Sequence, residues 1–493
     1  MPEMYWSCTI AAILIFLGIF GSKVSSFLQI PILLVFLIIG MLAGSDGLGG
    51  IVFEDYAAAG NVGTIALMFI LFSGGYDTSW QSIRKVLFRG TLLSTLGVFL
   101  TAVFIGLFTA WWMEWPLPYG LLLGAIVSST DAAAVFAIFR SKSVGLKGDL
   151  RPILEYESGS NDPMATFLTF FMIQMIATSS TSYLTLLPQF FQKIGVGVVV
   201  GFLVAKAIVW LINRAKLEYD GLYYVIGIAT VLLSYGTSEI CSGNGFMSVY
   251  VSGLVFGNSR FIYKHGLGRF HDGIAWLMQV VMFLTLGLLV SPNRMAWDWS
   301  SGVLIAFFIM LVARPLCVFL CLLGSSFHWR EQLLISWGGI RGAAPIVLAI
   351  FPCLAFQNTP NADFALTIFH LVFFIVILSV LIQGKTLMPL ARWLGVDEVA
   401  RAKPRAPLEF EETGRSRSRM YEFEITHDSP IAGAEIKNIG FPGGALVYLI
   451  RRDGLFVVPN GSTVIQVEDE LMMMMEPEML PEVATLFGNN GNQ

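Results

Sequence analysis

The sequence has too little charge to surround a soluble protein of its length with hydrated side chains. Asp, Glu, Lys and Arg make up 13% of its 493 residues, about half of their usual share in soluble domains. Hydrophobic residues make up 55%, and this excess must face an apolar medium, for which a lipid bilayer is the default. The formal net charge of -4 argues against a nucleic-acid partner, because such partners require a basic surface.

Several kinds of site are also missing from the sequence. The five cysteines are scattered, and Cys317 and Cys321 lie four residues apart on one predicted helix, which is a poor geometry for a disulfide. The five histidines show no metal-ligand spacing. There is no Walker loop, no glycine-rich phosphate cradle and no recognisable nucleophile–base pair. We therefore expect no resident cofactor, no ATP-driven pumping and no enzymatic activity.

Long apolar runs separated by turn residues predict an all-α polytopic membrane protein with about thirteen spanning helices. The first run has no basic segment before it, so we interpret it as a true span and not as a cleaved signal. The predicted spans are 4–22, 30–46, 57–75, 90–113, 118–140, 149–178, 186–213, 220–240, 243–259, 270–290, 299–324, 332–356 and 362–390.

The basic residues between these spans fall mainly on alternate sides of the membrane. If the N-terminus lies outside, the inside loops contain clusters of Lys and Arg at 84–89, 140–151 and 260–269. The outside loops then hold little beyond Lys193 and Arg294. This is a positive-inside pattern. It predicts an outside N-terminus and a cytoplasmic C-terminus, and it requires an odd number of spans.

The composition changes sharply after the last span. We predict a transmembrane domain over 1–395, a charged cytoplasmic linker over 396–419 and a small cytoplasmic α+β domain over 420–490. We expect a regulatory or assembly role for this domain, with a folded tail that binds no ligand as the alternative. Its predicted elements are a strand from Tyr421, a helix over 431–439, strands over 445–450, 455–458 and 464–475, a hairpin turn at 453–454 and a helix over 481–487.

Ionisable side chains at bilayer depth are costly and are therefore candidates for function. The run from Ser128 to Asp131 places an acid among small residues, where it could cap a broken helix or bind a cation, or be purely structural. Glu157, Asn161 and Asp162 lie close together in the next span, directly before a proline. Glu157 and Asp162 are separated by about 140° around a helix. The two acids should therefore have different tasks.

The twelfth span carries a matching interruption, in which three glycines surround Arg341. Two broken helices at corresponding positions of two halves indicate an inverted-repeat transporter. We predict that Glu157 pairs with Arg341 and leaves Asp162 to bind a proton or a cation. We interpret Arg314 as part of a structural ion pair, and His271 as one of several polar residues near helix ends that are solvated.

Together these residues resemble the NhaP-type cation/proton antiporters of the monovalent cation:proton antiporter superfamily. The resemblance covers about residues 5–395 and rests on Thr130 and Asp131 in the fifth span, on 157–162 in the sixth and on 338–342 in the twelfth. The tail resembles the C-terminal half of potassium-conductance regulator modules. This pairing is typical of the potassium/proton branch of the family.

The resemblance implies a homodimer of thirteen-helix protomers in the bacterial inner membrane, with crossed, interrupted helices in each protomer. It implies that Asp162 binds either a proton or a monovalent cation, K+ or Na+, beside Asn161, in a site lined by Thr130, Asp131 and Ser158. An asparagine–aspartate pair is similar to that of the electroneutral members, which exchange one proton for one cation. K+ or Na+ and H+ are then transported cargo, with a role in pH and cation homeostasis.

One position departs from the family pattern, because Ser73 stands where members often carry a carboxylate. Ser73 is therefore only a possible lining residue, and the preference for K+ or Na+ stays open. The ligand of the tail, a small molecule or a nucleotide, is open as well. Two other functions remain alternatives: a cation channel gated by its cytoplasmic domain, although no filter-like run of carbonyls is found, and a ligand-sensing membrane receptor.

Overall fold

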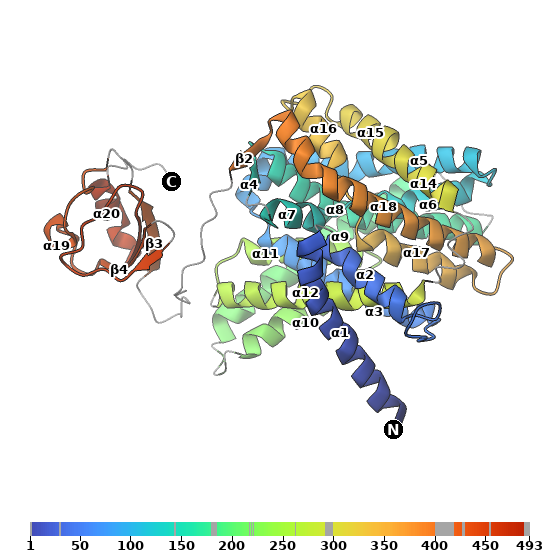
Figure 1. Ribbon diagram of the computed structural model, residues 1–493, viewed down its shortest axis with the longest axis horizontal. Helices are drawn as coiled ribbons and strands as arrows, with labels where there is room; N and C mark the ends of the chain where they lie inside the picture. The colour runs from blue at the N-terminus through green and yellow to red at the C-terminus, as the bar shows by residue number, and fades with distance from the viewer. Residues whose placement is uncertain are drawn as a thin grey trace. The chain divides into compact units, whose positions relative to one another are not determined.

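The computed structural model describes residues 2–28, 31–141, 144–178, 185–215, 217, 219, 221–261, 263–290, 299–399, 419–425, 429–452 and 455–487. The chain folds into two compact units. The larger unit contains Met1–Phe261 and Leu267–Arg401 and is almost entirely helical, whereas the smaller unit is formed mainly by the residues from Ala402 on (Figure 1).

The described helices of the larger unit coincide with the predicted spans, and some spans consist of two or three helical pieces. The first six spans are α1 (Pro2–Leu28), α2 (Ile32–Ala43), α3 (Tyr56–Asp77), α4 (Trp80–Leu92) with η1 (Leu93–Gly97) and α5 (Val98–Trp112), α6 (Leu117–Val127) with α7 (Ala132–Ser141), and α8 (Leu150–Ala177). The others are α9 (Leu186–Ala215), α10 (Gly221–Ile240), α11 (Gly245–Gly257), α12 (Lys264–Leu289), α14 (Trp299–Phe308) with η3 (Ile309–Ala313) and α15 (Arg314–Cys321), α16 (Trp329–Trp337) with α17 (Ala343–Phe356), and α18 (Ala362–Leu394).

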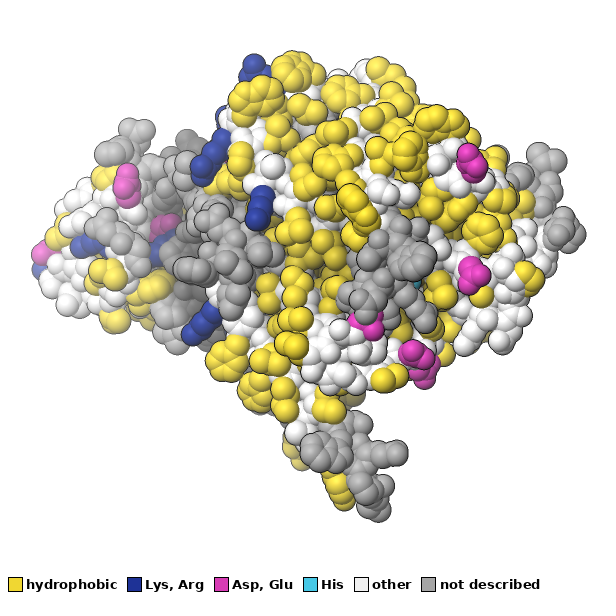
Figure 2. Space-filling model, turned by 45° about the vertical axis from the view of Figure 1, so that its right-hand side comes forward, with side chains coloured by type: hydrophobic (Ala, Val, Ile, Leu, Met, Phe, Trp, Pro, Cys, Tyr) yellow, Lys and Arg dark blue, Asp and Glu magenta, His cyan; other side chains and the backbone are white. Residues whose placement is uncertain are grey.

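The outer surface of these helices is apolar. Within the described ranges, seven helices are long and apolar enough to cross a membrane, and five shorter apolar helices accompany them. Large hydrophobic side chains such as Phe16, Phe20 and Trp210 are more than half exposed, and Figure 2 shows hydrophobic side chains over much of the visible face. Such a surface is stable only against lipid or another protein.

The two halves of the larger unit share two irregular features. The π-helical segments η1 and η3 interrupt the fourth and the eleventh span, and non-helical residues interrupt the fifth and the twelfth. A π turn contains one extra residue, so it changes the direction in which the following side chains point. Arg314 directly follows η3. The matching positions of these features confirm the predicted inverted repeat.

The helices pack in two groups that meet at α8 and between α3 and α17. In the first, which we call the core group, α8 packs against α4, α6 and α17, and α18 packs against α14 and α17. In the second, which we call the α11 group, α11 packs against α3, α9 and α10. Glycines allow the closest approaches, since a side chain at Gly253 of α11 would collide with the backbone of α3 at Phe72. α8 also contacts α9 and α11.

A small two-stranded sheet, which the sequence did not predict, completes the larger unit. β1 (Val144–Leu146) lies between α7 and α8, and β2 (Asp397–Val399) follows α18. The strands are antiparallel, with Val144 opposite Val399. Gly395 ends α18 with a φ of 70° and turns the chain into β2. Glycine adopts this left-handed conformation without steric cost, which is why it is common after helix ends.

The smaller unit contains a four-stranded sheet in the order β3-β6-β4-β5, in which all neighbouring strands are antiparallel. Apolar side chains of the sheet pack against the C-terminal helix, with Ile450, Leu471, Met473 and Val483 fully buried. The elements are β3 (Arg419–Glu424), α19 (Ile436–Ile439), β4 (Leu446–Arg452), β5 (Leu455–Val457), β6 (Glu470–Met475), η4 (Pro477–Met479) and α20 (Leu480–Leu486).

Two of the predicted elements of the smaller unit are shorter than expected. The predicted helix over 431–439 is helical only over Ile436–Ile439, because the chain turns at Gly433, whose φ is 84°. The predicted strand over 464–475 is reduced to Glu470–Met475, although Val464 forms an isolated bridge with Glu435. The predicted hairpin turn at 453–454 lies outside the described residues.

Candidate functional site

The two interrupted spans meet at their breaks, as the inverted repeat predicts. Residues 128–131 separate α6 from α7, and residues 338–342 separate α16 from α17. The backbone N–H of Asp131 donates to the carbonyl oxygen of Ile340 at 2.8 Å, which joins the two breaks. A side chain at Gly342 would collide with the Asp131 carboxyl group. Glycine is therefore needed where the second break passes the acid of the first.

Asp131 lies at the start of α7 and caps it. Its Oδ1 atom accepts a hydrogen bond from the backbone N–H of Ala134 at 3.3 Å. A carboxylate at this end of a helix satisfies a free N–H group and faces the positive end of the helix dipole. The fold thus gives Asp131 the capping role that was one of its two predicted roles, and it does so without removing the acid from the neighbourhood of Asp162.

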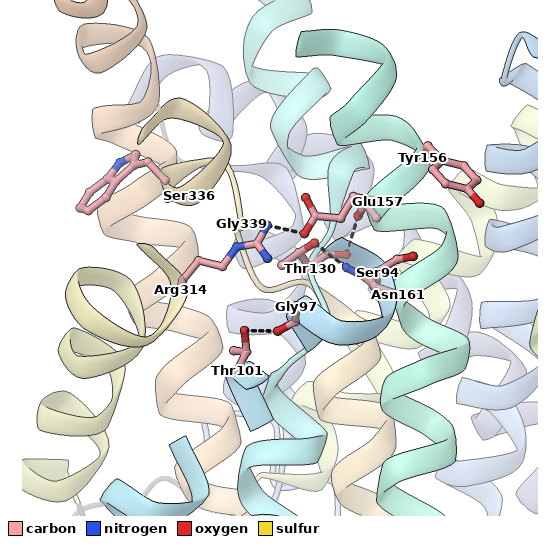
Figure 3. A network of polar contacts seen from close by, with 12 residues as sticks. Ser94, Gly97, Thr101, Thr130, Tyr156, Glu157, Asn161, Arg314, Ser336 and Gly339 are labelled. Atoms are coloured by element: carbon pink, nitrogen blue, oxygen red, sulfur yellow. Dashed lines mark hydrogen bonds and ion pairs between the residues drawn. The ribbon is translucent and has the colours of Figure 1, made fainter. Parts of the chain in front are cut away.

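Helix α8 brings its polar residues to the same break. Ser158 donates from Oγ to the carbonyl oxygen of Thr130 at 2.5 Å. Asn161 donates from Nδ2 to Thr130 Oγ1 at 2.6 Å. Figure 3 shows the side chains of Asn161 and Thr130 pointing toward each other. Ser158, Asn161 and Thr130 are all buried. The structure thus brings together the residues that the sequence predicted to line one site.

Three buried oxygens at this place have no hydrogen-bond partner among the described residues. They are Asp162 Oδ1, Asn161 Oδ1 and Ser129 Oγ. The Asp131 carboxylate acts electrostatically on the Asp162 carboxyl group, and the Ser129 hydroxyl lies next to that carboxyl group without full hydrogen-bond geometry. Buried polar atoms are nearly always satisfied, so a cluster of exceptions requires an explanation. Ser129 is not among the predicted site residues, and the signal for it in the sequence is the small polar run before Asp131.

The ion pair of Glu157 is different from the predicted one. Glu157 Oε1 lies 2.5 Å from Arg314 Nη2 (Figure 3), and the two side chains are only 1% and 2% exposed. The predicted pair of Glu157 with Arg341 is therefore wrong, whereas the interpretation of Arg314 as part of a structural ion pair is confirmed. Arg314 directly follows the π turn η3, which places its side chain beside Glu157. No residue pattern in the sequence indicates this turn.

Arg341 instead binds the carbonyl groups that the broken helices leave free. Its Nε donates to the carbonyl oxygen of Val127, the last residue of α6, at 2.8 Å. Its Nη1 donates to the carbonyl oxygen of Gly339, just after α16, at 2.6 Å. A cation at the C-terminal ends of two helices is favourable, because unpaired carbonyl groups and the negative ends of the dipoles lie there. Arg341 therefore bridges the ends of the two broken helices.

Comparisons with known proteins identify the family of the chain that carries this site. The family described as "Sodium/hydrogen exchanger, transmembrane" matches residues 11–393, which is more than half of the chain. The chain belongs to the sodium/hydrogen exchanger family. In the same exchanger chain, residues 420–488 match the TrkA-C domain.

The exchanger has similar relatives over nearly its whole length. It is 36% identical over 490 residues to the K(+)/H(+) antiporter NhaP of Alkalimonas amylolytica, covering 99% of this chain and 84% of that protein. It is 38% identical over 482 residues to the K(+)/H(+) antiporter NhaP2 of Shewanella oneidensis, covering 97% and 82%. A solved structure, the sodium proton antiporter MjNhaP1 of Methanocaldococcus jannaschii at pH 8, matches with a TM-score of 0.70 and 26% identity, covering 80% of this chain and 99% of that chain.

Two further polar residues of the exchanger lie outside this cluster of hydrogen bonds. Ser73 is buried in α3, and α3 packs against both α8 and α17. His271 of α12 is 0% exposed, and its ring centroid lies 4.6 Å from that of Phe72. Among the described residues, neither ring nitrogen of His271 has a hydrogen-bond partner. The interpretation of His271 as solvated near a helix end is therefore wrong, because neighbouring helices cover it.

Proposed function

We propose that the exchanger transports a monovalent cation, K+ or Na+, against protons by letting the two compete for Asp162. The observation that carries this proposal is the cluster of unpartnered buried oxygens on Asp162, Asn161 and Ser129. A carboxylate with neutral oxygens beside it suits a weakly hydrated cation, and the same carboxylate can take a proton. The names of the relatives, K(+)/H(+) antiporters and a sodium proton antiporter, support the same function.

The charges around the site favour electroneutral exchange. Three carboxylates (Asp131, Glu157 and Asp162) and two guanidinium groups (Arg314 and Arg341) surround the two breaks. With all five groups ionised, the cluster carries one negative charge. Either one proton or one monovalent cation on Asp162 makes it neutral. The empty site alone is charged, and moving a net charge through a medium of low dielectric is costly.

This difference makes exchange obligatory. A core group that moves relative to the α11 group can carry a neutral, loaded site across the membrane, but the movement of the charged, empty site is slow. Each outward movement with a bound ion must therefore be followed by a return with a bound ion, and net transport results when the two ions differ. Asp131 and Glu157 keep their capping and pairing roles throughout, so that only the Asp162 carboxyl group changes its state of binding.

The experiment that tests this function compares two changes from carboxylate to amide on the same helix. Asp162→Asn should abolish cation/proton exchange in reconstituted vesicles, measured by the dequenching of a pH-sensitive dye with K+, Na+ and Li+ in turn. Glu155→Gln is the matched control, since Glu155 forms an exposed pair with Arg151 at the start of α8. Vigorous exchange by the Asp162→Asn protein would remove Asp162 from the site.

Competition also predicts how pH and cation concentration combine. Protons occupy Asp162 at low pH, so the cation concentration that gives half-maximal exchange should rise as the pH falls. Higher cation concentrations should in turn shift the acidic limit of activity to lower pH. Two independent sites would not couple in this way, and unchanged half-maximal concentrations across the pH range would contradict a shared site.

We also propose the assembly and location that the resemblance implied. The exposed apolar side chains of α1, among them Phe16 and Phe20, support a homodimer in a bacterial inner membrane, which cross-linking in membranes would detect. The positive-inside pattern supports an outside N-terminus and a cytoplasmic C-terminal unit. The TrkA-C match supports a regulatory role for that unit, with a small molecule or nucleotide as ligand.

A further inference from the structure

The corner between α10 and α11 contains a buried asparagine that contacts the site helix. Asn244 is 5% exposed, and its Nδ2 donates to the carbonyl oxygen of Pro163 at 3.1 Å. Pro163 is the residue after Asp162. The other groups of Asn244 are fixed as well, because Oδ1 accepts from the N–H of Met247 at 2.9 Å and the backbone N–H donates to Lys193 of α9 at 2.9 Å.

This hydrogen bond joins the two helix groups beside the cation site. Asn244 begins α11, in the α11 group, whereas Pro163 lies in α8, which carries Asp162. Pro163 has no N–H group, so the helix is less constrained at this point than a regular α-helix. We propose that Asn244 is a positioning residue of the exchanger: through the Pro163 carbonyl group it sets where the Asp162 carboxyl group stands relative to Asn161.

The two cargo ions depend on this position to different degrees. An alkali cation needs several oxygens at matched distances, whereas a proton binds to the carboxylate alone. Losing the Asn244 donor should therefore weaken cation binding and leave proton binding almost unchanged. Asn244 would thus contribute to selection between the cargo ions without touching either of them. This inference rests on the proposed competition at Asp162.

A serine at 244 separates the two roles of the asparagine. Asn244→Ser keeps a side-chain oxygen that caps α11 but is too short to reach Pro163, whereas Asn244→Ala removes the cap as well. Asn258→Ser is the matched control, because Asn258 lies at the other end of α11 and its Nδ2 donates to the carbonyl oxygen of Thr78, directly after α3, at 2.8 Å. All variants are compared as full-length protein in vesicles, with thermal stability measured in parallel.

We expect Asn244→Ser to raise the apparent KM for K+ or Na+ by about three- to tenfold, in line with the loss of one hydrogen bond. The pH midpoint at saturating cation should not move, and Asn258→Ser should keep the KM of the natural protein. An unchanged KM in Asn244→Ser, or a defect in Asn244→Ala alone, would overturn the proposal and leave only a capping role. In both cases Asp162→Asn would still abolish exchange, which distinguishes failure of this proposal from failure of the proposed function.

A second and independent observation concerns the sheet of β1 and β2. β1 lies in the loop between α7, which begins beside Asp131, and α8, which carries Asp162. β2 is the start of the chain that continues to the C-terminal unit. The pairing is reinforced next to the strands, since the backbone N–H of Lys147 donates to the carbonyl oxygen of Val396 at 3.1 Å and its Nζ donates to that of Gly395 at 2.9 Å.

The sheet therefore pairs β2, in the chain that leads to the C-terminal unit, with β1, in the loop between α7 and α8. The other end of this connection is α18, where Ser379 accepts a hydrogen bond from the backbone N–H of Arg341 at 3.0 Å. We infer that the β1–β2 sheet is the coupling element through which the C-terminal unit acts on transport. A force on β2 would reach Asp131 through helix α7 and Asp162 through the first turns of α8. This inference rests on the proposed regulatory role of that unit.

The test combines a change in the sheet with a change in the C-terminal unit, in the full-length chain. Gly145→Pro removes the central N–H group of β1 and cannot pair in the middle of a strand, whereas Gly145→Ala keeps that group and is the matched control. Val483→Asp places a charge in the fully buried core of the C-terminal unit, and limited proteolysis shows whether that unit has unfolded.

With Gly145→Ala, unfolding of the C-terminal unit by Val483→Asp should change the exchange rate in vesicles. With Gly145→Pro, the same change should alter the rate by less than about twofold, because the connection is already broken. Equal effects of Val483→Asp in both backgrounds would overturn the inference, and so would the absence of any effect with Gly145→Ala. Loss of all exchange in Gly145→Pro would also contradict it, since the sheet would then be required for folding of the site.

Discussion

The buried ion pair of Glu157 and Arg314 predicts an unequal response to the loss of either partner. Both side chains are almost completely buried, and removing one partner of such a pair typically costs about 3–5 kcal/mol of stability, because the other charge is left uncompensated. Arg341 lies close enough to interact with both residues. Glu157→Gln leaves Arg314 without its acid and with a second guanidinium group nearby, whereas Arg314→Met leaves Glu157 with Arg341 nearby.

We therefore expect Glu157→Gln to lower the Tm of the purified protein more than Arg314→Met does. The double variant should recover part of the loss relative to Glu157→Gln, because it removes one acid and one base together. Thermal unfolding in detergent, followed by fluorescence and checked by size-exclusion chromatography, measures all three proteins under one condition. An Arg314→Met protein that is less stable than Glu157→Gln would refute the reasoning, since it would show that Arg341 cannot compensate Glu157.

Two further changes test the geometry around the breaks. Thr130→Val removes the oxygen that accepts from Asn161 Nδ2. It should lower the stability by about 1–3 kcal/mol, because a buried donor is left unsatisfied, and raise the apparent KM for the cation. Thr130→Ser keeps a hydroxyl group and should restore most of the stability, measured by thermal unfolding, and most of the cation affinity, measured in vesicles. Gly342→Ala adds a methyl group against the Asp131 carboxyl group and should reduce the exchange rate at least tenfold, whereas a Gly221→Ala control meets open space and should transport normally.

The sequence was sufficient to predict the spans, the two breaks and the residues that meet there. Each of these depends on local signals: apolar length for the spans, glycine and small polar residues for the breaks, and acids at bilayer depth for the site. Thr130, Ser158 and Asn161, which the family resemblance implies at one site, are joined by hydrogen bonds in the structure. The patterns of the smaller unit likewise predicted its strands, although the ends of two elements were misplaced.

What the sequence could not predict is which of several compatible partners a buried group meets. Two arginines, Arg314 and Arg341, were possible partners for Glu157. Its pairing with Arg314 depends on a π turn that the residue types of 309–313 do not indicate. Arg341 appeared to require an acid, yet helix-end carbonyl groups satisfy two of its donors. The β1–β2 sheet escaped prediction for a similar reason, since pairing between residues as far apart as Val144 and Val399 is a property of the fold.

The π segment η3 also determines how this chain must be compared with others. Because a π turn holds one additional residue, the same five residues of Ile309–Ala313 wound as regular α-helix would rotate Arg314 by about 100° relative to α14. The arginine would then point away from Glu157, although no side chain of the pair had changed. A relative with regular helix in place of this π turn would therefore keep its arginine beside the acid only if it had one residue fewer, and an alignment would show this as a gap of one position within 309–313.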